Sequence, residues 1–291
     1  MARIYVFPGQ GAQTIGMGSD LYKNNDKARA VFDMVDDALG EKLSDVIFNG
    51  PMETLTLTAN VQPAILATSL AMFHAANLPM PDYVAGHSLG EYSALCAAGA
   101  LSVSDAARLV RARGNAMQNA VPLGAGITAV VLGLDIDVVK QICEKYDADV
   151  ANDNCPGQVV ISGLKEKIEP AMDALKEAGA RRVMPLALSV PVHCRAQESA
   201  AEKMREILDT IEIKEPIVPI ISNKTAKPMT DAAEIKESLI YQMTHGVRWR
   251  ESVLEMVNLG IDDLTEIGPG NVLCGLVSRT TDKINAHKLE I

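Results

Sequence analysis

The stretch Tyr83–Tyr92, which reads Y-V-A-G-H-S-L-G-E-Y, restricts what this chain can fold into more than any other stretch. A short apolar run ends at Gly86 and a helix-forming run begins just after Gly90, so a G-x-S-x-G pattern falls between an expected strand and an expected helix. Glycines on both sides of Ser88 permit a sharp turn that exposes the serine hydroxyl, as in a nucleophile elbow. The Leu89 N–H would open the helix and can stabilise a developing oxyanion.

The five-letter pattern does not by itself establish a nucleophile. A glycine-flanked turn with an ordinary surface serine would look the same, and about 0.1 matches are expected by chance in a chain of this length. The flanking strand and helix favour the catalytic interpretation. The rest of the chain must then supply a base and substrate contacts.

Composition sets the class of protein and argues against several partners. The 291 residues are enough for one large α/β domain or two smaller ones, and 48% are hydrophobic and 22% charged, as in soluble globular proteins. The net charge of −10 argues against nucleic acid, and the apolar stretches are too short to span a membrane. The five scattered cysteines form no C-x-x-C pair, so we expect no disulfide framework, no metal site and a cytoplasmic location.

A second glycine-rich loop, Pro8–Gln13, follows an expected buried strand at Arg3–Phe7. A strand that leads into such a loop resembles a phosphate-binding turn for nucleotides. However, Thr14 stands where G-x-G-x-x-G requires glycine, and no Walker lysine follows. The alternative is that the loop presents backbone N–H groups to a site built at strand ends.

The order of expected elements divides the chain into an outer α/β layer and an insert. Between residues 126 and 192 the pattern reads β-α-β-β-α-β, the split βαβ order of a ferredoxin-like unit. We therefore predict a large subdomain with parallel strands from residues 1–125 and 193–291, and a small subdomain from residues 126–192.

Three local expectations accompany this division. A helix is expected over Ser104–Ala120, with Ser104 as its N-cap. The last strand of the insert is expected over Arg182–Leu188, and the polar tail from Thr280 is expected to be loosely held.

A nucleophilic serine needs a base within hydrogen-bond reach, and the chain offers five histidines. His87 neighbours the serine on the elbow, where adjacent side chains point apart, while His74 lies in an apolar helix and His287 in the polar tail. His193 lies in a proline-fixed segment directly after the insert, where a cleft between subdomains would form. It is the preferred base, with His245 near an expected helix C-terminus as the alternative.

Six motifs that occur in order along the chain resemble a single enzyme family. They are Gly9–Gln13 (G-Q-G-A-Q), Gly86–Tyr92 (G-H-S-L-G-E-Y), Arg111–Gly114 (R-A-R-G) with Met117 and Gln118, Asn152–Gly163 (N-D-N-C-P-G-Q-V-V-I-S-G), Val190–His193 (V-P-V-H) and Gly268–Gly270 (G-P-G). Together they resemble the malonyl-CoA:acyl carrier protein transacylase family over nearly the whole chain. The resemblance implies an α/β fold, in which an α/β-hydrolase-like large subdomain carries an inserted ferredoxin-like (βαββαβ) small subdomain.

The resemblance also implies roles for individual residues. Ser88 would be the acylated nucleophile and His193 its base, while Gln10 and Leu89 would supply the oxyanion-hole amides. The family orients its histidine through a backbone carbonyl near the V-x-W stretch, here that of Arg248, so the serine and histidine form a dyad. No metal and no cofactor are implied, because the CoA thioester is a substrate.

Arg113 would bind the malonyl carboxylate in such an enzyme. Arginine is permanently charged and forms two parallel bonds to a carboxylate, and an unpaired buried guanidinium would reject an acetyl group. The helical pattern alone favours a solvated arginine beside Arg108 and Arg111. The match to the R-G-x-x-M-Q motif of the family favours the binding role.

The implied reaction transfers the malonyl group of malonyl-CoA to the phosphopantetheine thiol of acyl carrier protein, through a malonyl-serine, in fatty acid biosynthesis. An acyltransferase serving a polyketide synthase, a serine thioesterase and a non-catalytic binding protein are the alternatives. Two departures from the family are Ala12, where serine is frequent, and Val192, where serine or phenylalanine is frequent. Because the latter position shapes the acyl pocket, selectivity between malonyl and methylmalonyl is left open.

A basic rim is expected around the cleft, because carrier proteins are acidic. The candidates near the cleft segment are Arg181, Arg182, Arg195, Lys203 and Arg205. The alternative interpretation is that these are ordinary solvated surface charges.

Overall fold

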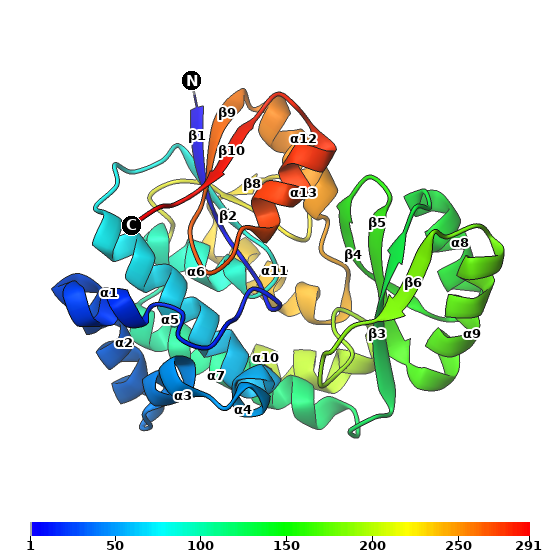
Figure 1. Cartoon of the computed structure of the whole chain (residues 1–291), viewed down its shortest axis with the longest axis horizontal. Helices are drawn as coiled ribbons and strands as arrows, with labels where there is room; N and C mark the ends of the chain where they lie inside the picture. The colour runs from blue at the N-terminus through cyan, green and yellow to red at the C-terminus, as the bar shows by residue number, and fades with distance from the viewer. Residues whose placement is uncertain (1) are drawn as a thin grey trace.

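Two separate β-sheets organise the chain (Figure 1), and the computed structural model describes residues 2–291. The larger sheet has six strands in the order β10-β9-β1-β2-β7-β8. These strands are β1 (Ala2–Phe7), β2 (Tyr83–Gly86), β7 (Ile220–Ile221), β8 (Pro228–Met229), β9 (Ile261–Glu266) and β10 (Asn285–Lys288). Each neighbouring pair is parallel except β7 and β8, so the sheet is nearly but not wholly the parallel sheet predicted.

The larger sheet lies between two layers of helices. Tyr5 and Phe7 of β1 belong to one hydrophobic cluster and Ile4 and Val6 to another, because successive side chains of a strand point to opposite faces. The first cluster is packed against by α1 (Ser19–Asn24) and includes residues of α2 (Asp26–Leu39), α3 (Leu43–Asn49), α4 (Met52–Thr56), α5 (Thr58–Ala76), α6 (Gly90–Ala97), α7 (Val103–Ala120), α10 (Glu198–Leu208) and α11 (Ala232–Thr244). The second includes residues of α12 (Trp249–Asn258) and α13 (Val272–Thr280).

The smaller sheet is antiparallel and has the order β4-β5-β3-β6. Its elements are β3 (Gly126–Leu132), α8 (Ile136–Lys145), β4 (Asp149–Cys155), β5 (Gln158–Leu164), α9 (Lys165–Glu177) and β6 (Arg182–Pro185), which confirms the β-α-β-β-α-β order predicted from the sequence. Val139 of α8 and Leu175 of α9 pack on one face of this sheet. Val130 and Val160 lie on the other face, toward the larger sheet, where they line a cavity.

Three local predictions are corrected by the structure. The tail after Thr280 contains β10, which pairs with β9, because an edge strand needs apolar residues on one face only: Ala286 packs against the second cluster, and Ile284, directly before the strand, is buried in it. The N-cap of α7 is Ser102, whose hydroxyl accepts from the Asp105 N–H, and not Ser104. The last strand of the insert ends at Pro185, and the following segment lines the cavity.

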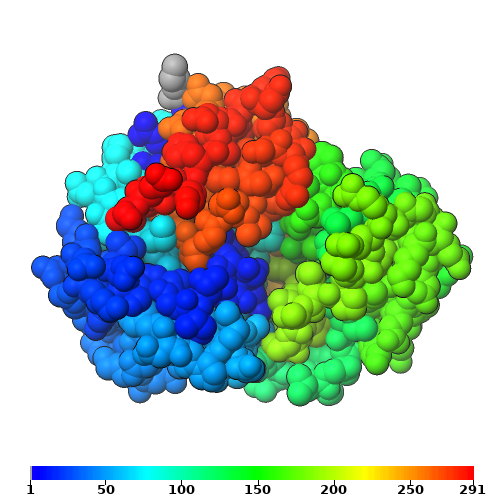
Figure 2. All heavy atoms as spheres, in the orientation of Figure 1, coloured from blue at the N-terminus to red at the C-terminus, as the bar shows by residue number. Residues whose placement is uncertain are grey.

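The backbone of β4 joins the smaller sheet to the segment between α11 and α12. The Val247 N–H donates to the Ala151 carbonyl at 2.9 Å, and the Asp153 N–H donates to the Val247 carbonyl at 3.0 Å. Gly246 is required here, since a Cβ on it would lie 2.3 Å from the Val150 carbonyl oxygen. A recess is visible where the blue and green parts of the surface meet (Figure 2). The chain after β6, through the short 3₁₀ turn η1 (Arg195–Gln197), returns beside it to α10.

Helices α5 and α7 approach each other closely at Gly114. A Cβ at this position would lie 2.5 Å from the Ala59 Cα and 2.6 Å from the Thr58 carbonyl oxygen. No side chain can fill such a gap without moving one helix. The close approach matters because Arg113, the residue before, bonds to Gln62 of α5.

We predict that Gly114→Ala lowers the free energy of unfolding by about 1–3 kcal/mol through overpacking. Gly275→Ala is a matched control in α13, because the nearest atom to its added Cβ is an Arg279 nitrogen 3.9 Å away. This control should be neutral or stabilising by up to about 1 kcal/mol, as alanine favours helix. Urea denaturation followed by circular dichroism measures both, and equal effects would contradict the assigned contact.

Candidate active site

The turn that carries Ser88 is tight because backbone atoms of three segments meet there. A Cβ on Gly86, at the end of β2, would lie 1.9 Å from the Gly90 carbonyl carbon. A Cβ on Gly90, at the start of α6, would lie 2.0 Å from the Phe7 carbonyl oxygen of β1. Ser88 itself has a φ of 55°, a left-handed conformation that non-glycine residues adopt rarely. The strand–turn–helix geometry predicted for G-x-S-x-G is therefore present.

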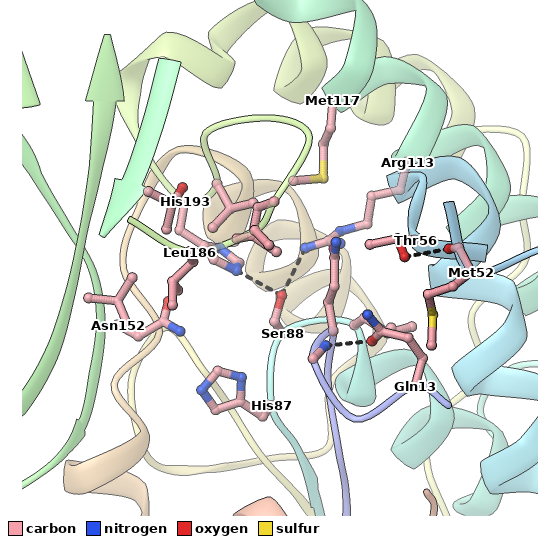
Figure 3. Close-up of a pocket in the computed structure, with 18 residues that line it drawn as sticks. Gln13, Met52, Thr56, His87, Ser88, Arg113, Met117, Asn152, Leu186 and His193 are labelled. Atoms are coloured by element: carbon pink, nitrogen blue, oxygen red, sulfur yellow. Dashed lines mark hydrogen bonds between the residues drawn. The ribbon is translucent and has the colours of Figure 1, made fainter. Parts of the chain in front are cut away.

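The structure brings His193 to this serine. The Ser88 Oγ lies 2.7 Å from the His193 Nε2, and Figure 3 shows the hydroxyl between the imidazole and a guanidinium. His193 is buried, with a φ of 52°, so both residues of the pair have left-handed backbones. Strained conformations at two contacting polar residues are typical of sites where geometry matters more than local stability.

The carbonyl that holds His193 is that of Gln242, and the prediction of Arg248 is wrong. His193 Nδ1 lies 2.5 Å from the Gln242 carbonyl oxygen near the end of α11. The Arg248 carbonyl instead accepts from the Ser252 N–H and hydroxyl in the first turn of α12. Because a carbonyl only accepts, Nδ1 carries the proton and Nε2 offers its lone pair to the serine.

The environment keeps this imidazole neutral. Burial lowers the pKa of His193 to about 3, and the positive charge of Arg113 acts in the same direction, while the bond to Gln242 opposes it. A neutral imidazole can accept a proton from Ser88, as a general base requires.

Arg113 reaches the same serine from α7, although its helix pattern alone favoured a solvated side chain. Its Nη1 donates to Gln62 Oε1 at 2.8 Å, and its Nη2 donates to Gln242 Oε1 at 2.9 Å and to Ser88 Oγ at 3.2 Å. The residue is 2% exposed, and its Nε has no acceptor among residues 2–291. A buried guanidinium with an unused donor is suited to an anionic ligand.

The neighbouring arginines of α7 are engaged elsewhere. Arg108 forms an ion pair with Asp105 at 3.0 Å on the same helix, and Arg111 bonds to Asn60 and Glu41. Only Arg113 of the three is directed into the cavity that contains Ser88. The helical spacing could not distinguish them, because the choice depends on which face α5 covers.

Gln10 and Leu89, the predicted amide donors, both line the cavity around Ser88. Within residues 2–291, neither backbone N–H is paired with an acceptor. The loop that carries Gln10 is held beside the elbow, because the His87 N–H donates to the Phe7 carbonyl at 3.0 Å. The two amides are thus available to an oxygen bound near the serine.

Two adjoining cavities lie between the sheets. The one that contains Ser88, His193 and Arg113 has a volume of about 430 Å³, and its neighbour has about 380 Å³. The residues that line both are Gln10, Gly11, His87, Asn152, Val160 and Leu186. Together the cavities offer space for an extended ligand that ends at the serine.

The other histidines lie outside the dyad. His87 Nε2 is 2.9 Å from Asn154 Oδ1, and the ring lines both cavities. It does not bond to Ser88, which agrees with the structural role expected for this histidine. His245, the alternative base, stacks on Tyr241 with ring centroids 3.7 Å apart, and His287 lies on β10 beside Thr265.

Four residues of the site were not predicted from the sequence, and three of them, all with amide side chains, carried no signal that pointed to them. Gln62, Asn223 and Gln242 contact the predicted residues from separate elements, and Glu91 lies in the first turn of α6. Amide side chains occur throughout surface helices, so only the tertiary contacts identify these. The Glu91 of the G-H-S-L-G-E-Y motif could have been noticed as an acid in an otherwise apolar helix.

Among residues 2–291, no group of three or more histidine, cysteine, aspartate or glutamate side chains is arranged to hold a metal ion. Across the same residues, no helix has the length and apolar character to cross a membrane. The five cysteines are all free thiols.

Known proteins resemble this chain over nearly its whole length. The acyl transferase domain family matches residues 4–291. The malonyl CoA-acyl carrier protein transacylase of Bacillus subtilis is 48% identical, over 96% of this chain and 90% of the relative. The enzyme of the same name from Escherichia coli K12 is 41% identical, over 98% of this chain and 94% of the relative.

Solved structures agree with these sequences. An acyl-carrier-protein S-malonyltransferase from Bartonella henselae superposes with a TM-score of 0.96 at 46% identity, covering 99% of this chain and 95% of that one. A malonyl-transacylase solved in complex with a type II PKS acyl-carrier protein gives a TM-score of 0.96 at 40% identity, covering 99% of this chain and 96% of that one. The mixed α/β fold with two sheets is shared with these proteins. On this evidence, which confirms the resemblance seen in the motifs, the chain belongs to the malonyl-CoA:acyl carrier protein transacylase family.

Proposed function

We propose that this chain transfers the malonyl group of malonyl-CoA to the phosphopantetheine thiol of acyl carrier protein, and so supplies extender units for fatty acid biosynthesis. The observation that carries the proposal is the position of the Ser88 Oγ, 2.7 Å from a neutral imidazole and 3.2 Å from a buried guanidinium. The first group activates a hydroxyl and the second binds a carboxylate, as malonyl transfer requires.

In the first half of the reaction, Ser88 Oγ attacks the thioester carbonyl while His193 Nε2 accepts its proton. The Gln10 and Leu89 amides hold the oxyanion, and the positive end of α6 at Leu89 contributes to its stabilisation. The imidazolium then protonates the departing CoA thiolate, which leaves a malonyl ester on Ser88. The carrier thiol attacks this ester in the second half, with His193 again accepting and returning a proton, so the kinetics should be ping-pong.

Arg113 gives the site its preference for a diacid. The terminal carboxylate of the malonyl group would bind its guanidinium, whose Nε has no acceptor among residues 2–291. An acetyl group would leave the buried charge without a partner, which costs binding free energy. A thioesterase would have no use for this buried arginine.

The finer description of the fold is also part of the proposal. The strand–turn–helix at Ser88 supports a hydrolase-like large subdomain from residues 1–125 and 193–291. The β-α-β-β-α-β order and the antiparallel sheet support a ferredoxin-like small subdomain from residues 126–192.

Acyl carrier protein is the proposed partner, as in the complex of the related malonyl-transacylase. That complex contains a carrier of a type II PKS, so service to a polyketide pathway is the second candidate, and assays with the two kinds of carrier distinguish them. Of the predicted basic rim, Arg195, Lys203 and Arg205 form ion pairs with acidic residues of this chain. Arg181 and Arg182 are exposed at the start of β6.

The central test is covalent loading. We predict that the wild-type protein, mixed with malonyl-CoA alone, gains the mass of one malonyl group by intact-protein mass spectrometry, and that Ser88→Ala gains none. A Ser88→Ala protein that loads as well as the wild type would exclude the proposed nucleophile.

Removing the guanidinium should change substrate preference. We predict that Arg113→Ala lowers kcat/KM for malonyl-CoA by at least about 100-fold, through loss of charge-assisted bonds, with a much smaller effect on acetyl-CoA. Steady-state assays with both donors measure the ratio. The carboxylate role is wrong if the ratio stays at the wild-type value.

The base should stay unprotonated in mildly acid solution. With a His193 pKa of about 3, modification of Ser88 by the neutral reagent phenylmethylsulfonyl fluoride should not slow between about pH 8 and about pH 5. An imidazole with the ordinary pKa of 6.5 would slow it more than about tenfold over this range. Because the pKa is lowered on folding, the unfolded chain takes up the proton first, so stability decreases as the pH falls below 6.5. Circular dichroism at each pH controls for this loss.

A further inference from the structure

One buried carboxylate, that of Glu91, is linked to Ser88, His193 and Arg113 through single intervening residues, without bonding to any of the three. Glu91 lies in the first turn of α6 and is fully buried. Its Oε1 accepts from the Asn223 N–H at 3.2 Å, and its Oε2 accepts from the Gln242 side-chain amide. Each of these two partners leads to the site by a separate route.

The first route passes through Gln242. Its backbone carbonyl holds His193, and its side-chain Oε1 accepts from Arg113 Nη2 at 2.9 Å. A glutamine amide has one acceptor side and one donor side. Because Glu91 accepts from the NH₂ side, the oxygen side must face Arg113. The Glu91 carboxylate therefore determines which side of the Gln242 amide faces Arg113. With the oxygen toward Arg113 the guanidinium has an acceptor, whereas with the NH₂ toward Arg113 two donors would face each other.

The second route passes through Asn223. Its side-chain oxygen accepts from the Ser88 N–H at 2.7 Å, and its NH₂ donates to the Gly86 carbonyl at 2.6 Å. These bonds hold the backbone on both sides of His87, directly before Ser88, the residue with a positive φ. The Asn223 backbone is in turn fixed by Glu91.

Charge adds to the geometric argument. Burial raises the pKa of Glu91 to about 7, while the Asn223 N–H, the Gln242 amide and the charge of Arg113 favour the ionised form. In that form it offsets the positive charge of Arg113, which is also buried and lies one amide group away.

We propose that Glu91 is a positioning residue whose carboxylate fixes the orientation of the Gln242 amide and thereby aims the Arg113 guanidinium at the carboxylate of a diacid thioester. This rests on the proposed role of Arg113 and goes beyond it. Glu91→Gln tests the idea, because the two side chains have nearly the same shape. In this variant the remaining oxygen must face the Asn223 N–H, which cannot rotate. The new NH₂ then faces Gln242, whose amide turns over and presents its own NH₂ to Arg113.

The expected result for Glu91→Gln is a change in selectivity. The ratio of kcat/KM for malonyl-CoA to that for acetyl-CoA should fall at least about tenfold, mainly through a higher KM for malonyl-CoA. The reason is that the guanidinium is no longer held in the orientation that binds the malonyl carboxylate. Acylation by acetyl-CoA should change little. If Glu91 served only to keep the protein folded, both donors would suffer equally and the ratio would stay constant, which would overturn the proposal.

A matched control and two further variants sharpen the test. Glu266→Gln also replaces a fully buried glutamate, one that accepts from the Cys274 N–H at 2.8 Å, and it should leave the ratio unchanged. Adding Glu91→Gln to Arg113→Ala should not change the ratio further, because both act through one guanidinium. If Glu91→Gln fails to fold by circular dichroism, Gln242→Met replaces it. It removes the amide but keeps the backbone carbonyl, and it should lower the same ratio.

The outcomes separate this inference from the proposed function. The positioning role is overturned, and malonyl transfer is left intact, if Arg113→Ala alters the ratio but Glu91→Gln does not. Where Gln242→Met replaces Glu91→Gln, the same comparison applies to that variant. A normal ratio in Arg113→Ala as well would remove the carboxylate assignment on which both depend.

Discussion

Close contact between bare backbone atoms at the nucleophile turn is the constraint on which the rest of this structure depends. Gly86 and Gly90 bring β2, α6 and β1 together at distances that no side chain would allow, and Ser88 is held with a positive φ between them. The strain is maintained by hydrogen bonds from outside the turn, because the Asn223 side chain binds the Gly86 carbonyl and the Ser88 N–H. The consequence is a single hydroxyl that reaches the cavity, beside a Leu89 amide that has no acceptor within residues 2–291.

Burial determines the chemistry of the groups around this hydroxyl. Removal from water lowers the pKa of His193 and keeps it neutral, whereas Arg113 stays charged because guanidinium deprotonates only in strong base. In the proposed function, the same burial would make the charge of Arg113 selective, since a ligand without a carboxylate cannot satisfy it. The proposed base and the proposed carboxylate-binding group thus share one cavity between the two sheets.

The site is also a network of shared partners rather than a set of independent residues. Gln242 contacts His193 through its backbone and Arg113 through its side chain, and Glu91 orders both Gln242 and Asn223. Such networks respond to single substitutions as units, because each amide has one acceptor side to offer. Amide orientation, and not charge alone, is therefore expected to govern substrate preference.

The sequence by itself determined the elbow at Ser88, the strand and helix order of the insert and the family, because these depend on local spacing and on motifs in order. It also ranked His193 first among five histidines from its place after the insert. The family motif pointed to Arg113, which helical spacing alone did not separate from Arg108 and Arg111. Only the tertiary structure decided that Gln242 and not Arg248 holds the imidazole, and that the polar tail forms β10. Each of these depends on which distant segment packs against the residue, and no local pattern encodes that contact.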